Sequence, residues 1–295
     1  MFTFKQASPI TTCFFITSLL GRFSHPILLD IHLPVKTSAA ESCVYDEALR
    51  WNQALQRINA SRIDKEEEKI EYIDFISYHT PHATLYLADF NIEDEASSKS
   101  AKSIDQTKLN SLLRIIEKTV LDMEEEIQQG TFDFQYPCEI EINQPVVSGA
   151  YTMLDIQNNK CLQFVSDRVV NKTKSFVHFP SSVPDWVYNI DDQELREQKI
   201  RLIQQYGSPN VFEGFEPHVT VSFEKKTTAE ITEWRDVVVN KLKKKLPSQC
   251  KQHGNSLALG YTSIGGTVLK GPIIDIEMKL YEMEVFQYDS YTEIV

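Results

Sequence analysis

Hydrophobic residues recur along the chain at two spacings, and each spacing predicts one kind of element. Apolar positions three or four residues apart are typical of amphipathic helices, which we expect at residues 41–63, 109–129, 158–170, 193–206 and 228–246. Alternating or continuous apolar runs are typical of strands, which we expect at residues 72–76, 82–87, 132–156, 215–223, 257–261, 266–269 and 273–286. This mixture predicts an α+β fold with antiparallel sheet.

The predicted elements fall into two halves that resemble weak internal repeats. Each half offers a strand, a second strand with a His-x-Thr motif, a helix and further strands. We therefore expect two pseudo-symmetric lobes, each an antiparallel sheet with packed helices, and an active-site groove between the lobes. Residues 41–295 are assigned to this single bilobal domain, since a chain of 295 residues can bury one large core. The segments 91–107 and 176–206 are interpreted as insertions.

The first 40 residues differ in charge from the rest of the chain. They carry three basic residues against the single acid Asp30, whereas the remainder is strongly acidic. The uncharged stretch Pro9–Gly21 has the length of a signal-peptide hydrophobic region, but it is too short to span a membrane. No small-x-small cleavage pattern follows it directly. We interpret residues 1–40 as a leader or targeting segment outside the fold. A cytoplasmic location is favoured, and secretion or organelle targeting stays open.

Composition and charge limit the partners of the protein. Apolar residues make up 42% and charged residues 24% of the chain, as in ordinary soluble globular domains. The net charge of −12 argues against a protein that coats long double-stranded nucleic acid, because phosphate binding needs a basic surface. A short or cyclic nucleotide in a local pocket remains compatible with this charge. The sequence predicts no transmembrane segment.

Cysteines and sequons bear on the compartment. The five cysteines are widely spaced without a C-x-x-C pair, which excludes a zinc-site spacing and a dense disulfide framework. Without the leader the count becomes four, an even number. The sequons Asn59-Ala60-Ser61 and Asn171-Lys172-Thr173 are compatible with secretion. None of these features decides the location.

Two short motifs carry the candidate chemistry. Pro81-His82-Ala83-Thr84-Leu85 and Pro217-His218-Val219-Thr220-Val221 both read Pro-His-x-Thr-apolar and lie in predicted strands. A strand turns residues i and i+2 to the same face, so each motif presents an imidazole beside a hydroxyl. If the two strands meet, two imidazoles and two hydroxyls surround one point. We expect His82 and His218 to be catalytic, and Thr84 and Thr220 to bind phosphate.

The same residues suit acid–base chemistry at phosphorus. Opening a cyclic phosphodiester requires water to lose a proton on one side and the leaving oxygen to gain one on the other. Two imidazoles can hold opposite protonation states near neutral pH, while threonine hydroxyls donate to the phosphate oxygens. The sequence does not decide which histidine is the acid. Strict alternation also predicts Tyr86 and Ser222 on the histidine faces, as candidate walls of a substrate site.

The paired motifs resemble the signature of the two-histidine phosphoesterase superfamily. That family includes 2′-5′ RNA ligase-like proteins, cyclic phosphodiesterases and the enzyme that trims U6 small nuclear RNA. The matching residues are His82-Ala83-Thr84-Leu85 and His218-Val219-Thr220-Val221, and no other motif carries the resemblance. It implies a metal-independent phosphodiesterase without cofactors, often acting on a 2′,3′-cyclic phosphate.

Alternatives to this reading remain open. His79 and His82 form H-x-x-H, but no patterned carboxylate or cysteine accompanies them, so we expect no metal. The favoured function is hydrolysis of 2′,3′-cyclic or 2′-5′ phosphodiesters in an RNA end or a small nucleotide. One rival is a nucleotide- or RNA-binding module of the same fold that does not turn over. Another is an interaction protein in which the two motifs are core strands lying apart.

Overall fold

The computed structural model describes most of the chain between residues 27 and 288. Its described residues are 27–35, 43–63, 81–92, 105–130, 132–134, 137–148, 151–223, 237, 239–241, 243, 250–254, 256–261, 275–279 and 285–288. The helices are α1 (Cys43–Ile63), α3 (Gln106–Gln128), α4 (Lys160–Thr173), α5 (Asp185–Tyr188) and α6 (Gln193–Tyr206). The strands are β1 (Ile27–Pro34), β2 (His82–Phe90), β3 (Cys138–Ser148), β4 (Tyr151–Ile156), β5 (His218–Phe223), β6 (Lys251–Gly254), β7 (Ser256–Tyr261), β8 (Asp275–Lys279) and β9 (Val285–Tyr288).

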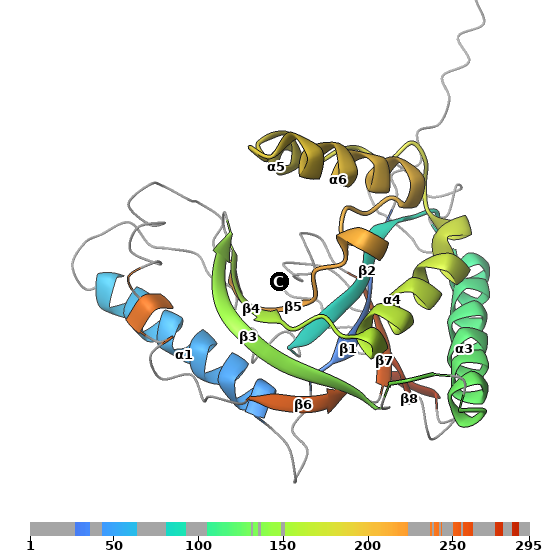
Figure 1. Ribbon diagram of the computed structural model, residues 1–295, viewed down its shortest axis with the longest axis horizontal. Coiled ribbons are helices and arrows are strands. Elements are labelled where there is room, and N and C mark those ends of the chain that lie inside the picture. The colour runs from blue at the N-terminus through green and yellow to red at the C-terminus, as the bar shows by residue number, and fades with distance from the viewer. Residues whose placement is uncertain are drawn as a thin grey trace, which may run out of the picture.

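The described strands form one antiparallel sheet in the order β6-β3-β4-β5-β2-β1-β7-β8-β9. This confirms the predicted α+β class with antiparallel strands and packed helices. The two halves, β6-β3-β4-β5 and β2-β1-β7-β8-β9, are joined edge to edge by the pairing of β2 with β5. Figure 1 shows the sheet curling, with α1 along its outer side beneath β3 and α3 and α4 at the opposite side. No helix in the described residues is long and apolar enough to cross a membrane.

Helices α1 and α4 each pack behind a motif strand. Helix α1 contacts β5, and α4 contacts β2. Their apolar stripes enter one continuous core with the strand residues that point away from the histidines; the core includes Val44, Trp51, Leu162, Val165, Leu33, Leu85, Leu154 and Val221. Burial of these side chains, at roughly 25 cal/mol per Å² of apolar surface, is what fixes the position of the motif strands.

The unit β1–α1–β2 is repeated as β4–α4–β5. In each unit the first strand pairs antiparallel with the motif strand in the same register. In each, a backbone N–H at the end of the first strand or just after it donates to the carbonyl of the proline that begins the motif, Val35 to Pro81 and Ile156 to Pro217. Three cross-strand pairs correspond between the units. Leu33–Ala83 corresponds to Leu154–Val219, His32–Thr84 to Met153–Thr220, and Pro34–His82 to Asp155–His218. An internal repeat is therefore present, but its unit is strand, helix and motif strand, whereas the prediction placed the helix after the motif strand.

A β-bulge lies at the last residue of each motif. The register shift leaves Leu85 as an extra residue on β2 and Val221 as an extra residue on β5. Helices on the core side satisfy the backbone there, since Ser166 of α4 donates to the Leu85 carbonyl at 3.0 Å and Asn52 of α1 donates to the Val221 carbonyl at 2.8 Å. A bulge reverses which face the following residues present.

The boundary placed at residue 40 is wrong for the part of that segment that the structure describes. Strand β1 lies inside the sheet between β2 and β7, and its side chains are buried except for Leu28, which is half-buried. The run Ile-Leu-Leu-Asp-Ile-His-Leu-Pro has the continuous apolar character of an inner strand. The domain therefore includes residue 27 onward. Residues 1–26 lie outside the described part, and the leader remains a prediction for them.

Most predicted elements agree with the structure where it describes them. Helix α6 has the predicted ends, and α1, α3 and α4 differ by a few residues at their termini. The shift in α3 follows from its cap, because Asp105 accepts from the backbone N–H groups of Thr107 and Lys108 and starts the helix early. The predicted strands 72–76 and 266–269 and most of the predicted helix 228–246 lie outside the described residues.

Two disulfides tie distant parts of the chain together. Cys43 at the start of α1 is bonded to Cys250, which immediately precedes β6. Cys138 at the start of β3 is bonded to Cys161 in the first turn of α4. Each bond joins the start of a helix to the start of a strand or to the residue before it, so the two bonds hold the helices against the sheet.

Removal of either helix-to-bulge hydrogen bond should destabilise the fold. Asn52→Ala or Ser166→Ala leaves a buried carbonyl without its side-chain donor, so each should lower the free energy of unfolding by about 1–3 kcal/mol. Urea unfolding measures the change. Asn110→Ala, at an exposed position of α3, is the control and should stay within about 0.5 kcal/mol. Equal effects at all three positions would contradict the role of the bulges.

The two disulfides should contribute unequally to stability. They close chain separations of 207 and 23 residues, and the loop-closure model gives about 5 kcal/mol for the longer and about 3 kcal/mol for the shorter. Replacement of both Cys43 and Cys250 by Ser should therefore lower the unfolding midpoint in urea more than the same replacement at Cys138 and Cys161. The reverse order would count against chain entropy as the source of the stabilisation.

Candidate functional site

The two motifs meet where β2 pairs with β5. Ala83 lies directly opposite Val219 in the antiparallel register. Continuing that register places His82 opposite Thr220 and Thr84 opposite His218, all on the other face of the sheet from Ala83 and Val219. We call these four residues, His82, Thr84, His218 and Thr220, the seam. The two histidines are diagonal neighbours in the seam, and the Cα atoms of such diagonal neighbours lie about 7–8 Å apart.

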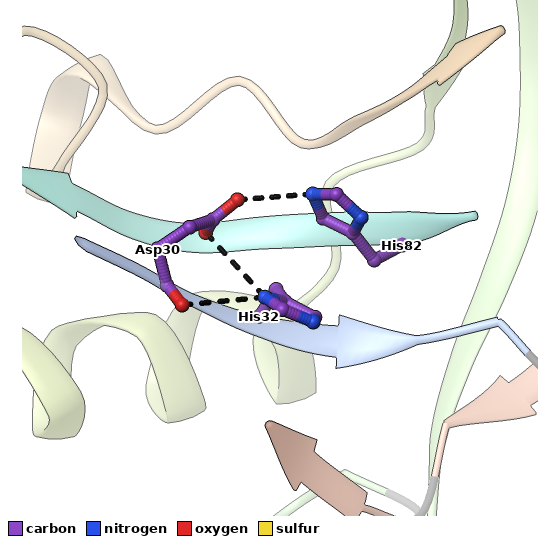
Figure 2. Close-up of side chains that lie close together, drawn as sticks. All are labelled: Asp30, His32 and His82. Carbon is purple, nitrogen blue, oxygen red and sulfur yellow. Dashed lines mark hydrogen bonds and ion pairs between the residues drawn. The ribbon is translucent and has the colours of Figure 1, made fainter. Parts of the chain in front are cut away.

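A buried carboxylate from the neighbouring strand β1 contacts the first motif. Oδ2 of Asp30 lies 2.9 Å from Nε2 of His82, and the hydroxyl of Thr84 donates to the same oxygen at 2.9 Å. Asp30 is 2% exposed and His82 5% exposed. A carboxylate can only accept, so Nε2 of His82 carries the proton of this contact. Figure 2 shows the carboxylate of Asp30 turned toward the His82 ring.

A second imidazole from β1 completes this cluster. His32 is 3% exposed, and its ring centroid lies 4.2 Å from that of His82. Its Nδ1 is 3.3 Å from the backbone carbonyl of Asp30 and 3.8 Å from Oδ1 of the same residue. Gly260 of β7 leaves room for the ring, since a Cβ there would lie 3.2 Å from Cε1 of His32. Figure 2 shows the three side chains together.

Burial and mutual contact shift the titration of the cluster. Burial raises the pKa of Asp30, but the opposing contributions of His82, His32 and Thr84 are together larger, so the carboxyl pKa lies below its ordinary value. Burial, followed by repulsion from His82, lowers the pKa of His32 to about 3 despite the attraction of Asp30. At neutral pH the cluster therefore contains a carboxylate and an uncharged His32 imidazole.

The second motif has a different environment. Nδ1 of His218 lies 3.0 Å from the backbone carbonyl of Glu216. A carbonyl only accepts, so Nδ1 carries a proton and, in the neutral ring, Nε2 holds a lone pair. The buried amine of Lys199 fixes the preceding segment by donating to Asn210, to the carbonyl of Gly214 and to the carboxylate of Glu216, at 3.0, 3.1 and 3.1 Å.

The pKa of His218 lies below its ordinary value. Burial is the largest cause, and repulsion from His82 adds to it, while the hydrogen bond to the Glu216 carbonyl and the charges of Asp30 and Glu216 oppose it. Asp155 lies directly opposite His218 on β4. The shift keeps the ring neutral at neutral pH. The two histidines thus use different ring nitrogens in these hydrogen bonds: Nε2 in His82 and Nδ1 in His218.

Two of the six predicted site residues do not share the seam face. Strict alternation predicts Tyr86 beside His82 and Ser222 beside His218, but the bulges at Leu85 and Val221 reverse the alternation. Tyr86 is 1% exposed and its hydroxyl donates to the Tyr206 carbonyl at 2.6 Å; burial raises its pKa. Ser222 is also 1% exposed. Both predicted walls are therefore wrong.

Asp30 and His32 were not predicted as site residues. Both lie in the segment that was set aside as a leader, so neither was weighed. The signal was present in Asp30-Ile31-His32, since a charged and a titratable residue at alternate positions of an apolar run point to the same face of a buried strand. The pseudo-symmetric positions in β4 hold Tyr151 and Met153, so this cluster belongs to one half only.

Asp30, His32 and His82 also form a set of ligands that fits a metal ion. One ligand atom from each residue can be chosen so that all three lie within 4.8 Å of one another. His79, the other member of the H-x-x-H pair, lies outside the described residues. The metal-binding geometry therefore comes from two different strands, which the spacing along one strand could not indicate.

These observations define an α+β protein in which two repeated His-x-Thr strands pair with each other and present His82 and His218 on one face of the sheet. Nε2 of His82 carries a proton, and Nε2 of His218 holds a lone pair in the neutral ring. No family model and no curated protein matches the chain. Among solved structures the chain is similar to Usb1 from Kluyveromyces marxianus, with 10% identity and a TM-score of 0.37 over 85% of this chain and 97% of that chain. A similarity this low assigns neither family nor activity.

Proposed function

We propose that the protein is a metal-independent phosphodiesterase that hydrolyses 2′,3′-cyclic or 2′-5′ phosphodiesters of an RNA end or a small nucleotide. The observation that carries the proposal is the Ala83–Val219 pairing, because it brings both His-x-Thr motifs to one face. Two imidazoles on either side of a phosphodiester supply the general acid and the general base that its hydrolysis needs. A protein that only binds nucleotides does not need both.

The different contacts of the two histidines support one assignment of roles. His218 is the base: its Nε2 lone pair takes a proton from water while the water oxygen forms a bond to phosphorus. His82 is the acid: its Nε2 proton passes to the 2′ or 3′ oxygen as the bond between that oxygen and phosphorus breaks. The product is a phosphomonoester with a free hydroxyl. Proton exchange with solvent then resets both rings.

The threonines complete the proposed site. Thr220 and Thr84 are half-buried on the seam, so their hydroxyls can donate to the non-bridging oxygens, which gain charge in the transition state. Thr84 and His82 currently converge on Oδ2 of Asp30. For these two donors to bind a phosphate oxygen instead, the Asp30 side chain would have to turn away from them.

The disulfides bear on where this activity would operate. Disulfides persist in oxidising compartments and are rare in the cytosol, and four of the chain's five cysteines are joined in two of them. This favours secretion or organelle targeting over the cytoplasmic location. The exposed Asn171 of its sequon, at the end of α4, is compatible with the same compartments.

Loss of either seam histidine should abolish hydrolysis without unfolding the protein. In the presence of EDTA, His82→Ala and His218→Ala should each lower kcat for a 2′,3′-cyclic nucleotide by about 10²- to 10⁴-fold, the range for a general acid or base. His253→Ala, on β6 at the sheet edge, is the matched control and should retain activity. Turnover that survives both seam substitutions would reject the site. Nucleotide binding without turnover in the unmodified protein would favour the binding module.

The pH profile should reflect the lowered pKa of His218. Protonation of Nε2 removes the lone pair that the base needs, so kcat/KM should rise with pH through the pKa of His218, and it should fall again at higher pH when His82 loses the proton that the acid supplies. Because that pKa lies below the ordinary value of 6.5, the midpoint of this acidic limb should fall below pH 6.5. A pH series with a 2′,3′-cyclic nucleotide gives the midpoint. A value clearly above 6.5 would contradict His218 as a desolvated base.

A further inference from the structure

We propose that Asp30, His32 and His82 form a Zn²⁺ site, and that the bound ion inhibits hydrolysis by occupying Nε2 of His82. The metal site stands on the geometry of the cluster alone, and its inhibitory effect rests on the proposed function. Nothing in the two-histidine reaction uses His32, so its place beside His82 calls for a separate explanation.

The three ligand atoms converge from rigid elements. An oxygen of Asp30 and a ring nitrogen of His32 come from alternate positions of β1, and a ring nitrogen of His82 comes from the neighbouring strand β2; these three ligand atoms lie within 4.8 Å of one another. Zn²⁺ binds nitrogen and oxygen ligands at about 2.0–2.2 Å, so small side-chain rotations bring these atoms around one ion. Figure 2 shows both rings turned toward the carboxylate.

One oxygen of the cluster accepts no hydrogen bond in the described part of the chain, and a bound cation would give it a partner. Oδ1 of Asp30 is buried and makes no hydrogen bond in the described part of the chain, and Nδ1 of His32 lies 3.8 Å from it. A buried carboxylate oxygen without a donor is costly, by about 1–3 kcal/mol or more. A divalent cation between Asp30 and the two imidazoles satisfies this oxygen and balances the buried negative charge.

The surroundings of the cluster resemble the outer contacts of metal ligands. The Thr84 hydroxyl donates to Oδ2 of Asp30 at 2.9 Å and so orients the carboxylate. Gly260 gives the His32 ring its space. In the second half, Tyr151 and Met153 replace Asp30 and His32 at the equivalent positions, so the seam offers this set of ligands once.

The ligand types select the ion and predict its effect. Two imidazoles and one carboxylate suit Zn²⁺, whereas Mg²⁺ and Ca²⁺ prefer sites made of oxygen. Binding to the metal requires the lone pair of His82 Nε2, so the proton at that atom is released and no longer reaches the leaving oxygen. His218 is not a ligand and keeps its role. Zinc should therefore remove the acid and leave the base.

Zinc binding is measured directly on the full chain after treatment with EDTA and its removal. Titration calorimetry with ZnCl₂ should give one site at the seam, and CaCl₂ and MgCl₂ should give none there. His32→Gln and Asp30→Asn should each weaken zinc binding by about 100-fold or more, while His253→Gln should not. Because a buried substitution can impair folding, the zinc-induced rise in Tm provides a second readout: it should be present in the unmodified protein and His253→Gln and absent in both cluster variants.

Inhibition is measured as the ratio of activity with zinc to activity with EDTA, which corrects for any effect of a substitution on hydrolysis itself. In the unmodified protein the ratio should lie about 100-fold below one, as expected for loss of a general acid. In His32→Gln it should stay near one. His218→Ala should be inactive yet bind zinc normally. Absence of zinc binding, or binding unchanged by both His32→Gln and Asp30→Asn, would overturn the site. Zinc binding in a chain without hydrolysis would support the site and contradict the proposed function.

Discussion

The pairing of Ala83 with Val219 is the constraint on which the rest of the site depends. It joins the two halves of the sheet, and it holds two histidines from distant parts of the chain on one face. Helices α1 and α4 maintain it from behind, each satisfying the carbonyl of a bulge with a buried polar side chain. This one strand pairing therefore leaves the core on one face of the sheet and both histidines on the other.

The two halves of the seam are alike in backbone and different in charge. Both motif strands share register, bulge and preceding proline contact, yet Asp30 and His32 stand beside the first motif where Tyr151 and Met153 stand beside the second. A symmetric backbone thus carries an asymmetric pair of imidazoles, with a proton on Nε2 of one and a lone pair on Nε2 of the other. The proposed acid–base catalysis needs this asymmetry, and the proposed cation site of the first half includes the same carboxylate.

Sequence patterns predicted the parts of this structure that depend on local periodicity. The α+β class, the existence of a repeat around each motif, helix α6 and both motif strands follow from apolar spacing and from Pro-His-x-Thr, but the order of elements within the repeat was predicted differently. The bulges after Leu85 and Val221 were not predictable, because the register shift depends on the neighbouring strand, and Tyr86 and Ser222 were misplaced for that reason. Asp30 and His32 were missed because the basic, apolar start of the chain looks like a leader, and only the sheet shows that β1 is an inner strand.

The most direct test of the central claim is whether one phosphate is held by both histidines at once. Two-dimensional NMR of the imidazole ¹H–¹⁵N correlations, recorded in EDTA while a nucleoside 2′- or 3′-monophosphate is added, follows each ring separately. The account predicts that the Nε2 signals of His82 and His218 shift together with one binding constant. A titration that moves one ring and leaves the other unchanged would contradict a shared site.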